Sequence, residues 1–253
     1  MAAWRSRSKA FLRIDSHVCF SANHPPEHLR AILARNRFDG AILVVDGGAG
    51  GDTGRALPET GPHIAGLIVR HGSADGHALD EYQRDGRFRG ICATLDGGMP
   101  QAAEELARRR IPLDLEMRPG DFPALLRLTA RLPDLRLAIN HLARPAFHLA
   151  PTEEWLRGME SAAQWPNVFC KISGLLTEVD RLPWSAAPIR PFVQHALRVF
   201  GPRRLMFGSE WPVRLPDVTW KESLAAFTQS IGANSIEVRE QLLGGTASAF
   251  YGL

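Results

Sequence analysis

Short apolar segments alternate along the chain with longer amphipathic ones. Eight mostly apolar runs, each short enough for a single strand, occupy residues 11–17, 40–48, 64–72, 88–98, 111–119, 135–141, 167–174 and 204–210. Between them, apolar residues recur every three or four positions, which predicts amphipathic helices. The clearest helical patterns cover residues 25–36, 99–110, 121–132, 151–164 and 189–200. Several of these begin with Pro, Asp or Thr, which are typical of helix N-termini.

Eight strand-then-helix units in 253 residues predict a closed α/β barrel, the (β/α)₈ or TIM type. The alternative is an open doubly wound sheet, but no G-x-G-x-x-G pattern follows the first strand. No internal repeat or linker divides the chain. We therefore expect a disordered basic tail over residues 1–10 and one barrel domain over residues 11–253.

The amino-acid composition limits the kinds of molecule that we expect the protein to bind. The chain has 30 Lys and Arg against 27 Asp and Glu, and the opening nine residues hold much of this small excess. Because basic residues are not interleaved with aromatic ones elsewhere, we expect no nucleic-acid partner. No apolar run reaches the roughly 18 residues that span a bilayer, so we expect no membrane partner. Three cysteines indicate free thiols in a reducing cytoplasm. The sequence leaves the oligomeric state undecided, with a homo-oligomer as one alternative.

The ends of the predicted strands carry the candidate chemistry, because catalytic groups of such barrels lie at the carboxyl rim. The eighth strand ends in "MFGSEWPV", residues 206–213, with Glu210 as its one carboxylate. A buried charge is costly unless it is paired or has a function, which makes Glu210 a candidate base or ligand. His17 ends the first strand and His141 the sixth. We expect these three side chains to converge as a catalytic set.

Period-two alternation predicts which other side chains point into the barrel. These are Asp15, His17 and Cys19 on the first strand and Asp114, Glu116 and Arg118 on the fifth. The seventh strand adds Lys171. This lysine has two interpretations, a contact to substrate or an inward cation that neutralises Asp114 or Glu116.

Four linked segments resemble the amidohydrolase-related family, also called amidohydrolase 2. They are "LARPAF" (142–147), "PNVFCKISGLLTE" (166–178), "GPRRLMFGSEWPV" (201–213) and "GGTASAFYGL" (244–253). The resemblance is to the lactonase branch, which includes fuconolactonase and 2-pyrone-4,6-dicarboxylate lactonase. It runs well from residue 88 to residue 253 and more loosely over residues 14–70.

This resemblance implies a barrel that hydrolyses a carbonyl compound with water. Metal-dependent members bind an ion through His-x-His on strand one, His on strand six and Asp on strand eight. In the lactonase branch the strand-eight acid can act as a base without an obligatory metal. The matching positions here are His17, His141 and Glu210, with Arg118, Arg144 and Lys171 at basic positions that could contact an anionic substrate.

The chain departs from the family pattern at its ligand positions. Cys19 replaces the second histidine of strand one, Glu210 replaces Asp, and Asn140 precedes the strand-six histidine. Either no cofactor is required, or one divalent metal, best matched by zinc, is held by His17, Cys19, His141 and Glu210. The alternative for Cys19 is a small buried thiol.

Two classes of function fit these residues. The first is a hydrolase that opens a small carboxylated lactone at the carboxyl rim. In it Glu210 takes a proton from water, His17 and His141 polarise the carbonyl, and the basic residues bind the substrate carboxylate. The second is a catalytically degenerate barrel that binds a small anionic ligand. A metal-dependent decarboxylase is a further alternative.

Overall fold

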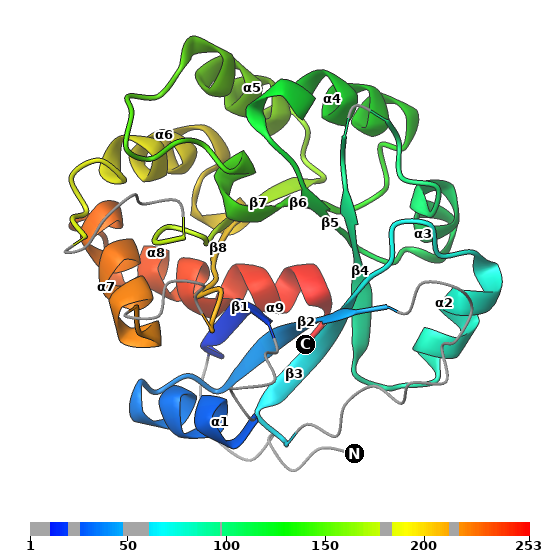
Figure 1. The fold of residues 1–253 in the computed structure, drawn as a ribbon, viewed down its shortest axis with the longest axis horizontal. Coiled ribbons are helices and arrows are strands. Elements are labelled where there is room, and N and C mark those ends of the chain that lie inside the picture. Colours follow the sequence, from blue (N-terminus) through cyan, green and yellow to red (C-terminus); the bar gives the residue numbers. More distant parts are fainter. Residues whose placement is uncertain (1–10, 20–25, 48–60, 97, 178–183, 213–217) are drawn as a thin grey trace.

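The protein is a barrel of eight parallel strands. The computed structural model describes residues 11–19, 26–47, 61–96, 98–177, 184–212 and 218–253, so the expected tail at 1–10 lies outside it (Figure 1). The strands form one sheet in chain order. They are β1 (Ile14–Cys19), β2 (Gly40–Asp46), β3 (Ile64–Arg70), β4 (Phe88–Thr94), β5 (Leu113–Glu116), β6 (Leu137–Ile139), β7 (Val168–Ile172) and β8 (Leu205–Phe207). The predicted (β/α)₈ architecture is confirmed.

Helices surround the sheet and follow its strands in sequence (Figure 1). They are α1 (Pro26–Arg35), α2 (Gly76–Gln83), α3 (Ala103–Arg109), α4 (Phe122–Arg131), α5 (Glu153–Ala163), α6 (Arg190–Phe200), α7 (Trp220–Ile231), α8 (Ile236–Glu240) and α9 (Thr246–Tyr251). Residues 48–60, between β2 and β3, lie outside the described ranges. Side chains of Asp75, Thr152, Thr219 and Ser235 cap helix N-termini, as helix-starting residues should. No described helix has the length and apolar character needed to cross a membrane.

Two apolar layers hold the barrel together. The larger one lies between the strands and the surrounding helices. The smaller one fills the barrel interior with side chains such as Ile42, Ile68 and Met206, and it includes Phe250 and Tyr251 of α9. Figure 1 shows α9, in red, lying across the ring of strands. The C-terminal helix therefore closes the amino end of the barrel, and the polar strand ends are left at the opposite mouth.

The barrel closes where β1 meets the segment that follows β8. The backbone N–H of Glu210 donates to the carbonyl of His17 over 2.8 Å, and Cys19 N–H donates to the carbonyl of Trp211 over 2.7 Å. These bonds continue the ladder past the end of β8, so β8 itself can stay short. They also fix the two candidate catalytic residues side by side.

A buried carboxylate on β1 ties this closure together. Asp15 is fully buried, and its Oδ1 accepts from the backbone N–H of Ser209 over 2.9 Å. Its Oδ2 accepts from the indole N–H of Trp220 on α7 over 2.7 Å. Burial raises the pKa of Asp15 to about 6, although these hydrogen bonds oppose the shift. The carboxyl group of Asp15, which joins β1 to the segment after β8, therefore changes its protonation state near pH 6.

This raised pKa predicts how stability depends on pH. Between about pH 4 and pH 6 the folded state keeps a proton on Asp15 that the unfolded chain has released, so raising the pH favours unfolding. We expect the free energy of unfolding to fall across this window by up to about 3 kcal/mol from this group. Urea denaturation at several pH values measures it.

The matched variants are Asp15→Asn, which cannot titrate, and Asp134→Asn in the exposed loop before β6. D15N should flatten the fall in stability across the window, and D134N should run parallel to the parent. A D15N curve as steep as the parent's would show that another group causes the slope.

A glycine allows two outer helices to pack closely. A Cβ atom at Gly158 of α5 would lie 2.0 Å from the Phe122 ring of α4, whereas a Cβ at Gly86 would meet nothing within 4 Å. We expect Gly158→Ala to lower the free energy of unfolding by about 1–3 kcal/mol through overpacking, despite the better helix propensity of alanine. Gly86→Ala is the control and should be close to neutral. Equal stabilities in thermal unfolding would contradict the packing argument.

Candidate functional site

The carboxyl mouth of the barrel brings together the residues that the strand ends supply. His17 lies on β1, His141 lies in the helical turn η3 (Asn140–Ala143) after β6, and Glu210 follows β8. Both histidines are 1% exposed, and the side chain of Glu210 is 14% exposed. The structure thus places the three predicted catalytic residues at one site, with the carboxylate nearest to solvent.

The two imidazoles pack edge to face. Their ring centroids are 4.6 Å apart and the rings are inclined by 69°. His141 Nδ1 lies 2.9 Å from the hydroxyl of Ser173, which fixes the ring. Its Nε2 is buried and forms no well-aligned hydrogen bond within the described residues, although it lies 3.4 Å from Glu116 and 3.6 Å from Glu210. This nitrogen is placed to meet a group that enters the site.

The backbone around His141 is held in an unusual conformation. His141, Leu142, Ala143 and Arg144 have φ values of 53°, 55°, 62° and 46°. Such left-handed residues cost about 1–2 kcal/mol each, so surrounding contacts must impose them. Leu142 and Ala143 are fully buried, and the Trp155 indole donates to the Leu142 carbonyl over 2.8 Å. The turn therefore directs His141 and Arg144 to the mouth.

Glu210 has a comparable local geometry. Its φ is 60°, and its Oε2 accepts from the Thr177 hydroxyl over 2.8 Å. Its Oε1 lies 3.6 Å from His141 Nε2 and 3.7 Å from an Arg144 nitrogen. One carboxylate oxygen is thus anchored, while the other faces the imidazole and the guanidinium.

Glu116, at the end of β5, is the second carboxylate of the site. Its Oε2 accepts from Arg144 over 3.0 Å and 3.2 Å, and its Oε1 accepts from the Asn140 amide over 3.0 Å. Burial alone would raise the pKa of Glu116. The imidazole of His141, 3.4 Å away, and the guanidinium of Arg144 instead hold this pKa well below its usual range. Glu116 is therefore a permanent carboxylate at neutral pH.

Lys171 lies beneath His17 inside the barrel. Its side chain is fully buried, and its Nζ lies 2.6 Å from Asp114 Oδ2 and 3.3 Å from His17 Nδ1. The Tyr251 hydroxyl donates to the same Asp114 carboxylate over 2.9 Å. Of the two interpretations of Lys171, the structure shows the inward cation. The geometry disfavours the expected substrate contact, because the ammonium is directed to Asp114 and has no exposed surface.

This arrangement sets the protonation of His17. Burial lowers the pKa of His17 well below its usual value, and the charge of Lys171 lowers it further, so the ring is neutral at pH 7. An ammonium can only donate, so Nδ1 must accept from Lys171, and the ring proton lies on Nε2. That Nε2 lies 3.8 Å from Cys19 Sγ at the rim. His17 therefore presents an N–H donor on the side of the ring opposite Lys171.

Cys19 is a free, partly buried thiol. Burial raises its pKa to about 11, with a further contribution from the negative charge of Glu210. The sulfur is consequently protonated at neutral pH and is a poor metal ligand in this state. The structure is consistent with the simpler interpretation of Cys19 as a packed thiol.

Three donors in the described residues are close enough to share a metal ion. His17, Glu116 and His141 offer ligand atoms within 4.8 Å of one another. This trio contains two of the four expected ligands, and Glu116 takes the place of Cys19 and Glu210. The distances suit a cation, but the proton on His17 Nε2 occupies the lone pair that a metal would need. With Lys171 charged, the donor set does not fit a tightly held metal.

A cavity of about 450 Å³ adjoins the site through Glu116 and Arg144. Arg118 lines it as an exposed side chain, whereas Arg144 is 24% exposed and already paired with Glu116. Asp96 and Asp121 also face the cavity. The two arginines predicted to bind substrate are thus together, but acidic groups surround them.

Sequence reasoning underestimated Glu116 and missed the residues that orient the site. Alternation put Glu116 on the inward face, yet only the fold brings it next to His141. Ser173 and Thr177 follow β7 without any motif that marks them. Hydrogen-bonding partners of this kind carry no sequence signal of their own.

Known proteins resemble this chain over most of its length. The sequence model of the amidohydrolase family matches residues 19–253. The chain is 31% identical to an uncharacterized protein, y4mH, of Sinorhizobium fredii over 70% of this chain and 65% of that protein. It is 30% identical to an L-fucono-1,5-lactonase of Burkholderia multivorans over 96% of each chain.

A solved structure shares the fold. A crystal structure of an amidohydrolase from Burkholderia multivorans with bound zinc superimposes with a TM-score of 0.80 at 27% identity, covering 96% of this chain and 99% of that chain. The fold, the arrangement of polar strand ends and the match over residues 19–253 agree with one another. The chain belongs to the amidohydrolase family.

Proposed function

We propose that this protein is a lactonase, which opens a small lactone by adding water to its carbonyl. The observation that carries the proposal is the Glu210 carboxylate, which faces the imidazole of His141 beside a cavity. The relative named L-fucono-1,5-lactonase supports the same reaction class. The free cysteines support a cytoplasmic location.

Glu210 is the proposed base. Thr177 holds one of its oxygens, and the other is directed to the position where a water would lie next to His141. Glu210 takes a proton from this water as the water oxygen bonds to the lactone carbonyl carbon. The negative charge that develops on the carbonyl oxygen accepts the Nε2 proton of His17 as a hydrogen bond. No charge change of His17 is needed, which suits its depressed pKa.

Collapse of the tetrahedral adduct completes the reaction. The carbonyl re-forms, the ring C–O bond breaks, and its electron pair stays on the departing oxygen. The carboxylic acid of Glu210 returns the proton to that oxygen, so the product is a hydroxy acid and Glu210 regains its charge. Each atom of water is then accounted for, and the enzyme is unchanged.

The charged residues that line the cavity limit the class of substrate that can bind there. Glu116 and Arg144 compensate each other, which leaves Arg118 against Asp96 and Asp121. A dicarboxylated lactone would meet repulsion here, whereas carboxylates readily accept hydrogen bonds from sugar hydroxyls. We propose a small hydroxylated lactone with at most one carboxylate, which Arg118 would bind.

Replacing the proposed base tests the mechanism. Glu210→Gln keeps the shape of the side chain and removes its basicity, so kcat should fall by roughly 10²–10⁴-fold. The measurement is acid release in a pH-stat, with a panel of sugar lactones and carboxylated lactones at neutral pH. Glu160→Gln, exposed on α5, is the matched control and should retain the parent rate.

A Glu210→Gln enzyme as fast as the parent would rule out this mechanism. A parent protein that binds lactones or their hydroxy acids but opens none of them would favour the degenerate barrel that only binds a small anionic ligand. Circular dichroism of both variants separates loss of the base from loss of the fold.

Whether the protein holds a metal ion can be tested separately. Because Lys171 fixes the proton of His17 on Nε2, we expect protein purified without chelator to hold well below one zinc per chain. Dialysis against EDTA should leave lactone opening unchanged. Elemental analysis of the parent and of Glu116→Gln measures this directly. One equivalent of zinc in the parent, lost in Glu116→Gln but kept in Cys19→Ser, would contradict our assignment and establish His17, Glu116 and His141 as ligands.

A further inference from the structure

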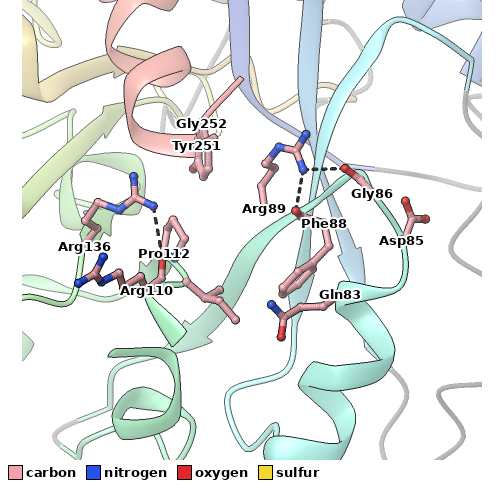
Figure 2. Close-up of a pocket in the computed structure, with 11 residues that line it drawn as sticks. Gln83, Asp85, Gly86, Phe88, Arg89, Arg110, Pro112, Arg136, Tyr251 and Gly252 are labelled. Atoms are coloured by element: carbon pink, nitrogen blue, oxygen red, sulfur yellow. Dashed lines mark hydrogen bonds between the residues drawn. The ribbon is translucent and has the colours of Figure 1, made fainter. Parts of the chain in front are cut away.

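A second cavity lies at the opposite end of the barrel from the proposed catalytic site. It has a volume of about 410 Å³ and is bounded by the start of β4, the start of β5 and the end of α9. Figure 2 shows Phe88, Pro112 and Tyr251 among its walls, with arginine side chains on either side. The cavity is large enough for a small organic molecule.

Three arginines give this cavity its charge. Arg89, Arg110 and Arg136 line it, together with one acidic residue, Asp85. Both oxygens of Asp85 are engaged by Arg87, over 3.0 Å to Oδ1 and 2.6 Å to Oδ2. Asp85 also attracts Arg89 through space, but among the described residues none of the three guanidiniums forms a hydrogen bond or an ion pair with a carboxylate.

Backbone carbonyls hold two of these guanidiniums in place. Arg89 donates through one terminal nitrogen to the carbonyls of Gly86 and Phe88, each over 2.8 Å, as Figure 2 shows. Its Nε is buried and has no hydrogen-bond partner within the described chain. Neutral carbonyls fix the side chain but do not compensate its charge. Arg89 thus holds its positive charge in a preorganised position at the cavity.

Arg136 is held in the same manner on the other side of the cavity. It donates to the Phe250 carbonyl over 2.7 Å. A weaker hydrogen bond to the Arg110 carbonyl, over 3.4 Å, is drawn in Figure 2. Burial lowers the pKa of Arg136, as expected for a cation that lacks a counterion. The side chain of Arg110 is exposed, and it forms no hydrogen bond to any other residue that the structure describes. It can therefore turn to a ligand without breaking a contact.

We propose that this cavity binds a phosphoryl dianion, either inorganic phosphate or the phosphate group of a small ester. Guanidinium forks match phosphate oxygens in pairs, and two of the three forks lose little conformational freedom on binding. A phosphate alone leaves most of the volume empty. Phe88 and Pro112 offer an apolar wall to the organic part of an ester. The site is separate from the proposed catalytic mouth.

Isothermal titration calorimetry at low ionic strength tests the site, with inorganic phosphate and glucose 6-phosphate as probes. The parent should bind at least one probe saturably in the micromolar to millimolar range. Arg110→Gln removes one charge without removing any hydrogen bond seen in the structure, and it should weaken binding about tenfold. Tighter binding of the ester than of phosphate would identify the organic part as a contributor.

Arg84→Gln is the matched control, because Arg84 is an exposed arginine near the cavity that does not line it. It should change the affinity by less than about twofold. Absence of saturable binding by the parent overturns the proposal. Equal weakening in Arg84→Gln and Arg110→Gln also overturns it, because general surface charge would then explain the binding. Neither readout depends on lactone hydrolysis.

Discussion

The carboxylate of Asp15 on β1 accepts hydrogen bonds across the seam at which the barrel closes, and the site is built on that seam. Ser209 and Trp220 donate to it from the segment after β8 and from α7. His17 lies two residues along β1 from Asp15, and Glu210 directly follows Ser209. The contacts that close the sheet therefore also place Glu210 next to the imidazoles. This arrangement has an energetic cost, because it buries the carboxyl group of Asp15 and raises its pKa.

Charges inside the barrel form a chain that runs from its closed end to its open mouth. Tyr251 contacts Asp114, Asp114 pairs with Lys171, and Lys171 donates to His17. A buried ion pair contributes little net stability, because desolvation offsets its attraction. Its consequence here is chemical, since it decides which nitrogen of His17 carries the proton. His17, which matches a metal-ligand position of the family, thus carries its proton on the nitrogen that would bind a metal.

The two ends of the barrel differ in how their charges are balanced. At the mouth, arginines lie beside carboxylates, and the pair of Arg144 and Glu116 is an example. At the amino end, Arg89 and Arg136 are held by carbonyl oxygens that carry no net charge. Balanced charges suit a hydroxylated neutral molecule, and unbalanced ones suit an anion. The two proposed sites thus differ in net charge.

The sequence by itself determined the architecture of this protein and most of its polar mouth. Eight apolar runs separated by amphipathic ones predict the barrel, because strands and helices have different periods. The barrel rule then placed His17, His141 and Glu210 at one rim, as the structure shows. Only the tertiary structure decided what each side chain faces. Glu116 meets His141 beyond the ends of the neighbouring strands β5 and β6. Lys171 on β7 reaches Asp114 on β5 inside the barrel, and that contact depends on how the sheet curves. Alternation fixes the face of a strand from which a side chain projects, but the partner on that face depends on strand register and packing.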